Sequence, residues 1–346
     1  MKTLLKQTLL ILIISAVACN KPEMNDPLEH FGMLYTQKLH PSSVIDLEQY
    51  DILHPVGVAK QDDKYYIRER SNENIFTEID FLTKEKISGV NIGNGPQEIL
   101  SIGGFQTRDN RILAYDINKK TIFQITQNKH SKLTVERFHK INYEKELFIL
   151  SYANDAIIAS GIFENYWLSY LNLKDELLSY LDFPNFAEME HIPMLQKSIL
   201  FLSTHTSISP NGKKLVAATQ SLGAISFCEI TSNNKLAEQK QIKYFPPIFH
   251  VKERGDISYD RKSKIGFCAL DSDDKYVYAL YSGRTSEKAG MESHHCEHLL
   301  IYNWDGVPVK YYHLEIPLYS MKYDKANNSI YGIGYNPEGV FIEYKL

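Results

Sequence analysis

The chain of 346 residues has few of the features that mark membrane-spanning, disulfide-bonded or nucleic-acid-binding proteins. It contains only four cysteines and two tryptophans, and no long run of basic residues. Its 38 basic residues are outnumbered by 42 acidic ones, and the net charge of −4 argues against a nucleic-acid partner. Beyond the N-terminus, no segment is apolar over the roughly 20 residues that cross a bilayer. The 23 tyrosines and 16 phenylalanines favour β-structure.

The one apolar run lies at the N-terminus. Lys2 and Lys6 precede the apolar and small residues 9–18, a segment about half as long as a membrane span. This pattern is typical of a secretory signal peptide. Residues 16–19, Ala-Val-Ala-Cys, resemble the bacterial lipobox, in which the cysteine is lipidated and the preceding peptide is removed. We therefore predict lipid attachment at Cys19; the alternative is a secreted protein whose cleavage site happens to precede a cysteine.

This reading divides the chain into three segments. Residues 1–18 are the expected signal peptide, residues 19–40 the lipidated cysteine and a tether, and residues 41–346 the folded domain. The acyl chains would hold the protein on a membrane. Asn20 stands where an Asp retains enterobacterial lipoproteins at the inner membrane. The expected location is the cell envelope, with the lipid in the outer membrane and the protein facing the periplasm or the cell surface.

Three cysteines remain after lipidation, an odd number. Cys228 and Cys268 lie in apolar, strand-like segments, and Cys296 lies among histidines. We expect Cys228 and Cys268 to be buried core thiols, and we see no disulfide framework.

A short polar turn between two apolar strands recurs six times. The turns begin at Asp62, Asp109, Asn154, Asn211, Asp273 and Asn327. The intervals of about 45 to 62 residues are close to the length of a propeller blade. Asn, Asp and Gly supply the backbone conformations that tight hairpins need.

These repeats predict an all-β fold, a six-bladed β-propeller with four-stranded antiparallel blades. The sixth repeat ends with its third strand, at 340–344, because the chain stops at residue 346. We expect the strand at 43–47 to complete this blade and thereby close the ring. Two tandem β-sandwiches are the alternative, but they explain neither the spacing nor the short last repeat.

Several motifs resemble those of a known family. The lipobox, Gly-Asn-Gly-Pro-Gln-Glu at 93–98, Leu-Tyr-Ser-Gly-Arg at 280–284 and Tyr-Asn-Trp-Asp-Gly at 302–306 together are similar to the TolB-like six-bladed propeller lipoproteins of Bacteroidetes. The resemblance covers about residues 30 to 346. It implies the fold and the compartment, and it carries over no catalytic residue.

Ligand-binding residues are expected where long connections meet the mouth of the channel. Three such connections are long, at 184–202, 245–264 and 283–298. The candidates at the ends of second strands or near the mouth are Arg68, Arg70, Asp116, Glu164, Arg284 and Tyr335. We expect Arg284 near the centre of the site; the alternative for each charged residue is a solvated loop charge or a structural ion pair.

A cluster of histidines with one cysteine is the candidate metal site. His294, Cys296 and His298 would share one side of a strand and could ligate Zn²⁺. The spacing is not that of a recognised zinc motif, and the alternative is a polar loop that enters a strand with Cys296 buried. We expect no cofactor, with a divalent metal at this trio as the alternative.

Two functions follow from these features. The first is a non-catalytic, membrane-anchored envelope lipoprotein whose propeller face binds a glycan, a peptide or a protein. The second is a metal-dependent hydrolase resembling the gluconolactonase-like propellers, which hold a divalent cation with inner carboxylate and Asn ligands. No Gly-x-Ser-x-Gly elbow is present, and the inner strands show no such ligand set, so we favour binding.

Overall fold

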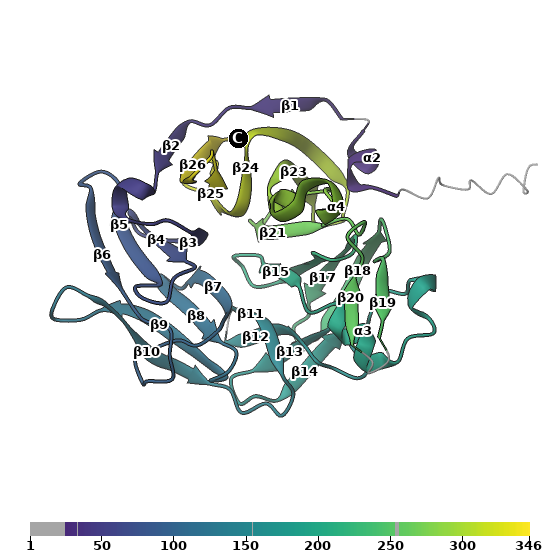
Figure 1. Cartoon of the computed structure of the whole chain (residues 1–346). Helices are drawn as coiled ribbons and strands as arrows, with labels where there is room; N and C mark the ends of the chain where they lie inside the picture. Colours follow the sequence, from purple (N-terminus) through teal and green to yellow (C-terminus); the bar gives the residue numbers. More distant parts are fainter. Residues whose placement is uncertain (1–24, 33, 154, 253–255) are drawn as a thin grey trace, which may run out of the picture.

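The computed structural model describes residues 25–32, 34–153, 155–252 and 256–346, so the predicted signal peptide and Cys19 lie outside the described residues. The strands form a ring of six blades around a central channel (Figure 1). The prediction of an all-β, six-bladed propeller is confirmed.

Each blade is a four-stranded antiparallel sheet whose first strand lines the channel. Blades 1 and 2 contain β3 (Pro55–Gln61), β4 (Lys64–Glu69), β5 (Phe76–Asp80) and β6 (Glu85–Gly89), then β7 (Ile102–Arg108), β8 (Arg111–Asp116), β9 (Thr121–Gln127) and β10 (Leu133–Lys140). Blades 3 and 4 contain β11 (Leu147–Ala153), β12 (Ala156–Gly161), β13 (Leu168–Asn172) and β14 (Leu177–Leu181), then β15 (Thr204–Ile208), β16 (Lys214–Thr219), β17 (Ala224–Ile230) and β18 (Leu236–Lys243).

Blades 5 and 6 share one long strand. Blade 5 contains β21 (Phe267–Ser272), β22 (Tyr276–Tyr281), β23 (Cys296–Asn303) and the first half of β24 (Pro308–Asp324). The second half of β24 is the inner strand of blade 6, which continues with β25 (Ser329–Tyr335) and β26 (Gly339–Lys345).

In five of the six blades, the turn between the first and second strands contains the left-handed backbone that its sequence predicts, supplied in blade 4 by Gly212. Asp62, Asn110, Asp155 and Asn328 all have positive φ, between 46° and 57°. Such left-handed residues are needed in tight hairpins, and Asn and Asp tolerate them better than other residues with a side chain.

The predicted ring closure is confirmed. β2 (Ser43–Asp46) pairs antiparallel with β26, with Ser43 opposite Glu343 and Asp46 opposite Val340. The N-terminal strand is therefore the outer strand of blade 6, and it covers the edge that β26 would otherwise expose.

The segment before β2 is packed against the propeller, although the sequence prediction treats it as a tether. β1 (Thr36–Leu39) pairs parallel with β24 and extends blade 5. The short helix α2 (Pro27–Phe31) places Phe31, which is fully buried, edge-on against Tyr302 with 4.8 Å between ring centroids. Its N-cap Asp26 pairs with Lys264 at 2.6 Å. The packed unit therefore begins well before residue 41.

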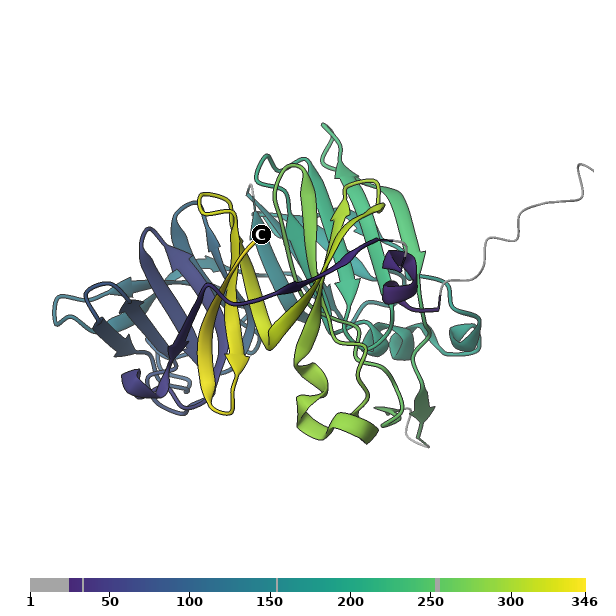
Figure 2. The same ribbon diagram turned by 90° about the horizontal axis from the view of Figure 1, so that it is seen from above.

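The long connections all lie on one face, opposite the hairpin turns (Figure 2). They contain η2 (Ala187–Met189) and α3 (Met194–Leu200), the hairpin β19 (Phe249–Val251) and β20 (Ile257–Tyr259), and α4 (Ser286–Ala289) with η3 (Gly290–His294). Another short turn, η1 (Glu48–Tyr50), follows β2. Among the residues that the structure describes, none of the helices has the length and hydrophobicity that a transmembrane span requires.

Candidate functional site

The central channel contains a cavity of about 320 Å³. The inner strands β3, β7, β11, β15, β21 and β24 supply most of its wall. Its polar lining includes Arg68, Gln106, His205, Gln220, His294 and Lys322. Within the described part of the chain, no Asp, Glu or Asn lines this cavity.

Glycines on the inner strands let this cavity form. Gly57 on β3 lies opposite Arg68 on β4, and a Cβ atom at Gly57 would lie 3.6 Å from Arg68 Nε. Because Gly57 has no side chain, Arg68 can extend over it and reach the channel from β4, the second strand of the blade. On β7, a Cβ at Gly104 would fall 2.3 Å from the Leu150 carbonyl oxygen. That close approach of β7 to β11 requires glycine.

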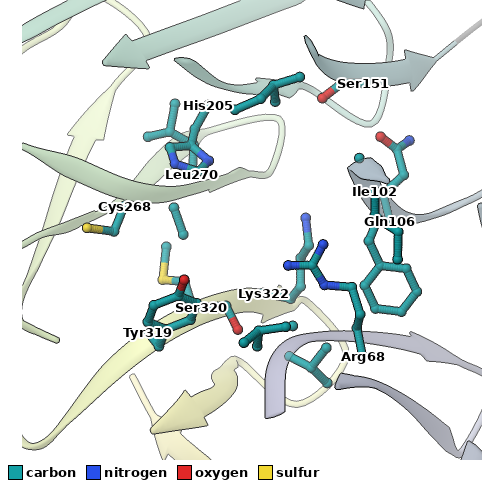
Figure 3. A pocket seen from close by; sticks show the side chains of 18 of the residues that line it. Arg68, Ile102, Gln106, Ser151, His205, Cys268, Leu270, Tyr319, Ser320 and Lys322 are labelled. Carbon is teal, nitrogen blue, oxygen red and sulfur yellow. The ribbon is translucent and has the colours of Figure 1, made fainter. Parts of the chain in front are cut away.

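The two cations that line this cavity, Arg68 and Lys322, have no acidic partner among its described lining residues. Figure 3 shows Arg68 and Lys322 extending into the cavity, with His205 across from them. Among the described residues, neither Arg68 nor Lys322 takes part in an ion pair. Arg68 Nε, His205 Nε2 and Ser320 Oγ are buried and make no hydrogen bond. Buried polar atoms are satisfied in most proteins, so three atoms without a partner around one cavity make it the candidate ligand site.

Burial changes the pKa values of both basic groups. Burial lowers the pKa of Arg68, and the positive charge of nearby Arg70 lowers it further, although Tyr319 acts in the opposite direction. Burial, with the charges of Lys322 and His294, lowers the pKa of His205 to about 4. At neutral pH the channel therefore presents a neutral imidazole beside two cations, because an arginine remains charged despite such a shift.

Two further cavities open at the mouth of the channel, on the face of the long connections. One, of about 460 Å³, is lined by Arg68, Arg70 and the chain around residues 99–102. The other, of about 750 Å³, is lined by Arg70, Tyr319, Tyr335 and residues of η3. Val56 borders all three cavities. The three cavities are therefore adjacent, and together they are called the recess.

An aromatic pair lies in the larger mouth cavity. The rings of His295 and Tyr335 are stacked, with 5.2 Å between centroids and 4° between planes. The Tyr335 hydroxyl donates a hydrogen bond to the Pro55 carbonyl at 2.7 Å, which holds the ring in place. Of the six predicted ligand-binding residues, the structure thus brings three to the recess, namely Arg68, Arg70 and Tyr335.

Asp116 and Glu164 lie away from the cavities just described. Asp116 is fully buried, and its carboxylate accepts hydrogen bonds from the Leu100 and Lys119 backbone amides at 2.7 Å and 3.0 Å. These bonds give it a structural role in blade 2. Glu164 is exposed in the connection between β12 and β13.

Arg284 follows β22 and pairs with Glu297 at the start of β23. His313 approaches the same carboxylate at 3.6 Å. Arg284 does not line any of the three cavities of the recess. Its predicted place near the centre of a ligand site remains a prediction, and its geometry favours a structural ion pair.

Replacing Arg284 with alanine tests these two roles. Because both partners of the ion pair are about 30 % exposed, the substitution should cost about 0.5 to 1 kcal/mol of unfolding free energy. Ligand binding should stay unchanged. Chemical denaturation and a binding titration on the same protein measure the two effects. Weakened binding without a loss of stability would instead show that Arg284 contributes to the ligand site.

The structure does not bring the candidate metal ligands together. His294 lines the channel and hydrogen-bonds to Gln220 at 3.2 Å. Cys296 packs in the core between blades 5 and 6, whereas His298 contacts Tyr311 on the side of blade 4. A shift in the pairing of β23 with β24 between Cys296 and His298 breaks the expected alternation. Across the described residues, no three His, Cys, Asp or Glu side chains are arranged to hold a metal.

Cys228 and Cys268 are buried strand residues, as the sequence predicts, and all three described cysteines are free thiols.

Sequence reasoning missed several residues of the recess. His205, Lys322 and Gln106 are polar residues on inner strands that line the channel. No local pattern singles out Lys322, because β24 carries several other charged and polar residues.

Comparison with solved structures identifies the same fold. A luciferin-regenerating enzyme aligns with a TM-score of 0.51 and 9% identity, over 88% of this chain and 95% of that one. A gluconolactonase from Xanthomonas campestris aligns with a TM-score of 0.49 and 10% identity, over 85% and 86% of the two chains. The β-propeller domain of Cps50 (Swd1) from Myceliophteria thermophila has a TM-score of 0.45 and 8% identity, with 84% of each chain covered. At these identities the likeness concerns the fold alone.

No curated protein matches the sequence significantly. Residues 35–325, however, match a family described as TolB-like 6-blade propeller-like. This match covers most of the chain and agrees with the six blades of the structure. The chain therefore belongs to the TolB-like six-blade propeller family.

Proposed function

We propose that the protein is a lipid-anchored lipoprotein of the cell envelope that binds a ligand in the recess of its propeller without chemical conversion. The lipobox at Cys19 supports the anchor, and the outer membrane is the proposed site of attachment. The observation that carries the binding role is the recess itself. It combines a channel with unsatisfied donors and a roomy mouth with an aromatic pair and Arg70.

The proposed ligand is a glycan, a peptide or a protein segment that reaches into the mouth. The stacked rings of His295 and Tyr335 offer aromatic surface in the mouth cavity, and Arg70, which is exposed, lines the same cavity. Aromatic platforms and arginines are the groups that recur at binding hot spots. A nucleic acid is not among the proposed ligands, because the net charge is negative.

The metal-dependent hydrolase does not fit the residues of the channel. A hard divalent cation needs oxygen ligands from carboxylates and amides. The described cavity wall has no Asp, Glu or Asn, and its charged side chains are cationic. We therefore propose no reaction through a metal.

A binding screen tests the proposed function. The mature protein, purified in a neutral detergent, is applied to an array of envelope glycans and peptides. We expect at least one class to bind, and Arg70→Ala to weaken this binding about tenfold, because charge-assisted hydrogen bonds are strong. The matched control is Lys325→Ala, an exposed cation on the opposite face. Equal losses in both variants, or an unchanged affinity in Arg70→Ala, would contradict the proposal.

A further inference from the structure

We infer that the channel is a receptor pocket for an anionic group, a carboxylate or a phosphate, carried by the ligand whose body lies in the mouth. This inference rests on the proposed binding function, and it adds the chemical class of the ligand. Its basis is the mismatch between the charges in the channel and the partners that the fold supplies for them.

The first observation is the state of Arg68. Its Nε is buried without a hydrogen bond, and the guanidinium extends into the cavity (Figure 3). A buried N–H without a hydrogen-bond partner costs free energy. A methionine would fill the same space without that cost, so the arginine at this position favours a ligand in the cavity. A guanidinium with free N–H groups is suited to a planar carboxylate or a phosphate.

The second observation is that the other polar groups of the cavity complement the same ligand. Lys322 brings a second positive charge, and a lysine ammonium only donates hydrogen bonds. His205 Nε2 and Ser320 Oγ have no hydrogen-bond partner. The low pKa of His205 leaves its ring neutral, so Nε2 carries a proton in one of the two tautomers and can then donate it. The Ser320 hydroxyl can donate as well. The pocket can thus surround an oxyanion with donors.

The third observation is the contrast with the opposite end of the channel. There Lys60 pairs with Asp324 at 2.7 Å, so the fold itself neutralises this cation. Lys322 also lines the cavity at this end together with Asp271, whose carboxylate accepts hydrogen bonds from the Tyr323 and Ser272 amides at 2.8 Å and 2.9 Å. This carboxylate is therefore occupied by the backbone.

The shape of the recess sets the size of the anionic group. The channel cavity, at about 320 Å³, admits a carboxylate or phosphate head, and the mouth cavity of about 750 Å³ has room for the rest of the ligand. Val56, His294 and Tyr319 border both spaces, so the two cavities are adjacent and a ligand that extends past these side chains would reach from one to the other.

The test uses small probes and the mature protein in a neutral detergent. Inorganic phosphate and glucuronate represent the two sources of the anion, and glucose is the neutral match for glucuronate. At constant ionic strength we expect phosphate, glucuronate or both to raise the melting temperature, and glucose to have no effect. No stabilisation of the wild-type protein by either anion at 10–100 mM would overturn the inference; this range is on the order of the weak affinity expected for a fragment.

The variants assign the effect to the channel. Arg68→Met should weaken anion binding at least about tenfold, because it removes a charge-assisted hydrogen bond. Without anion its melting temperature should be equal to or above that of the wild type, since a buried N–H without a hydrogen-bond partner is gone. Arg68→Lys should keep part of the affinity. If Arg68→Met fails to fold, Lys322→Met provides the same test, and Lys325→Met on the opposite face is the control. Equal anion binding in Arg68→Met, Lys322→Met and the control would also overturn the inference.

The outcome for this pocket is separable from that for the proposed function. A neutral glycan or peptide that binds through Arg70, while no anion binds the channel, would refute the anionic pocket and keep the proposed function. Anions that bind through Arg68, with no array ligand sensitive to Arg70, would support the pocket and refute the binding role of the mouth.

Discussion

A chain that begins at residue 48 should melt roughly 10 °C or more below one that begins at residue 25. The shorter chain lacks β2, so it exposes the edge of β26. It also lacks Phe31 and Leu47, two fully buried side chains. Each such loss costs about 2 to 5 kcal/mol, so we expect a total of about 5 kcal/mol or more. Calorimetry of the two proteins measures the difference.

A third chain, beginning at residue 41, separates the two contributions. It keeps β2 and Leu47 but lacks α2 and β1, so its stability should lie between the other two. Phe31→Ala in the chain that begins at residue 25 should reproduce about 3 kcal/mol of this intermediate loss. Identical melting of the chains that begin at 25 and 48 would show that the N-terminal strand does not close the ring in solution.

Cys19→Ser should abolish the lipid anchor almost completely. At a lipobox the cysteine sulfur receives the diacylglycerol, so if Cys19 is the predicted attachment site, a serine hydroxyl there should not serve as a substrate for the same transfer. Because stable attachment depends on the acyl chains, the variant should leave the membrane fraction for the soluble fraction. Metabolic labelling with palmitate, followed by membrane fractionation, measures both effects.

Cys228→Ser is the matched control, because Cys228 is a buried core thiol on β17. It should keep full labelling. Persistent palmitate incorporation in Cys19→Ser would refute lipidation at this residue and leave the simple secreted protein as the explanation of the N-terminus.

The fold was predictable because its determinants are local. Each hairpin turn carries Asn, Asp or Gly, and these residues accept the left-handed backbone regardless of what surrounds them. The count of turns predicts the count of blades, and the short sixth repeat predicts that another segment supplies its outer strand. The pairing of β2 with β26 shows that the N-terminal segment does so.

The candidate site was predictable only in part. Arg68 and Arg70 follow from their place at the end of a second strand, but no local pattern shows that Arg68 reaches the channel across Gly57. For the histidine cluster, the local pattern predicts a grouping of side chains that the structure does not contain. Strict alternation would have placed Cys296 and His298 on one face, but the shift in pairing with β24 separates them, and that shift depends on the bend of a strand shared by two blades.

The local sequence thus specifies the turns, the strands, the number of blades and the predicted lipid address, because each depends on residues close together in the chain. The charge of the recess depends on residues far apart: Arg68, His205 and Lys322 come from blades 1, 4 and 6 and meet only because the ring closes. Whether a cation has a partner is likewise a property of the assembled channel. Lys60 forms an ion pair with Asp324, whereas Arg68 has no carboxylate partner among the described residues, although both are basic residues on strands of the same blade.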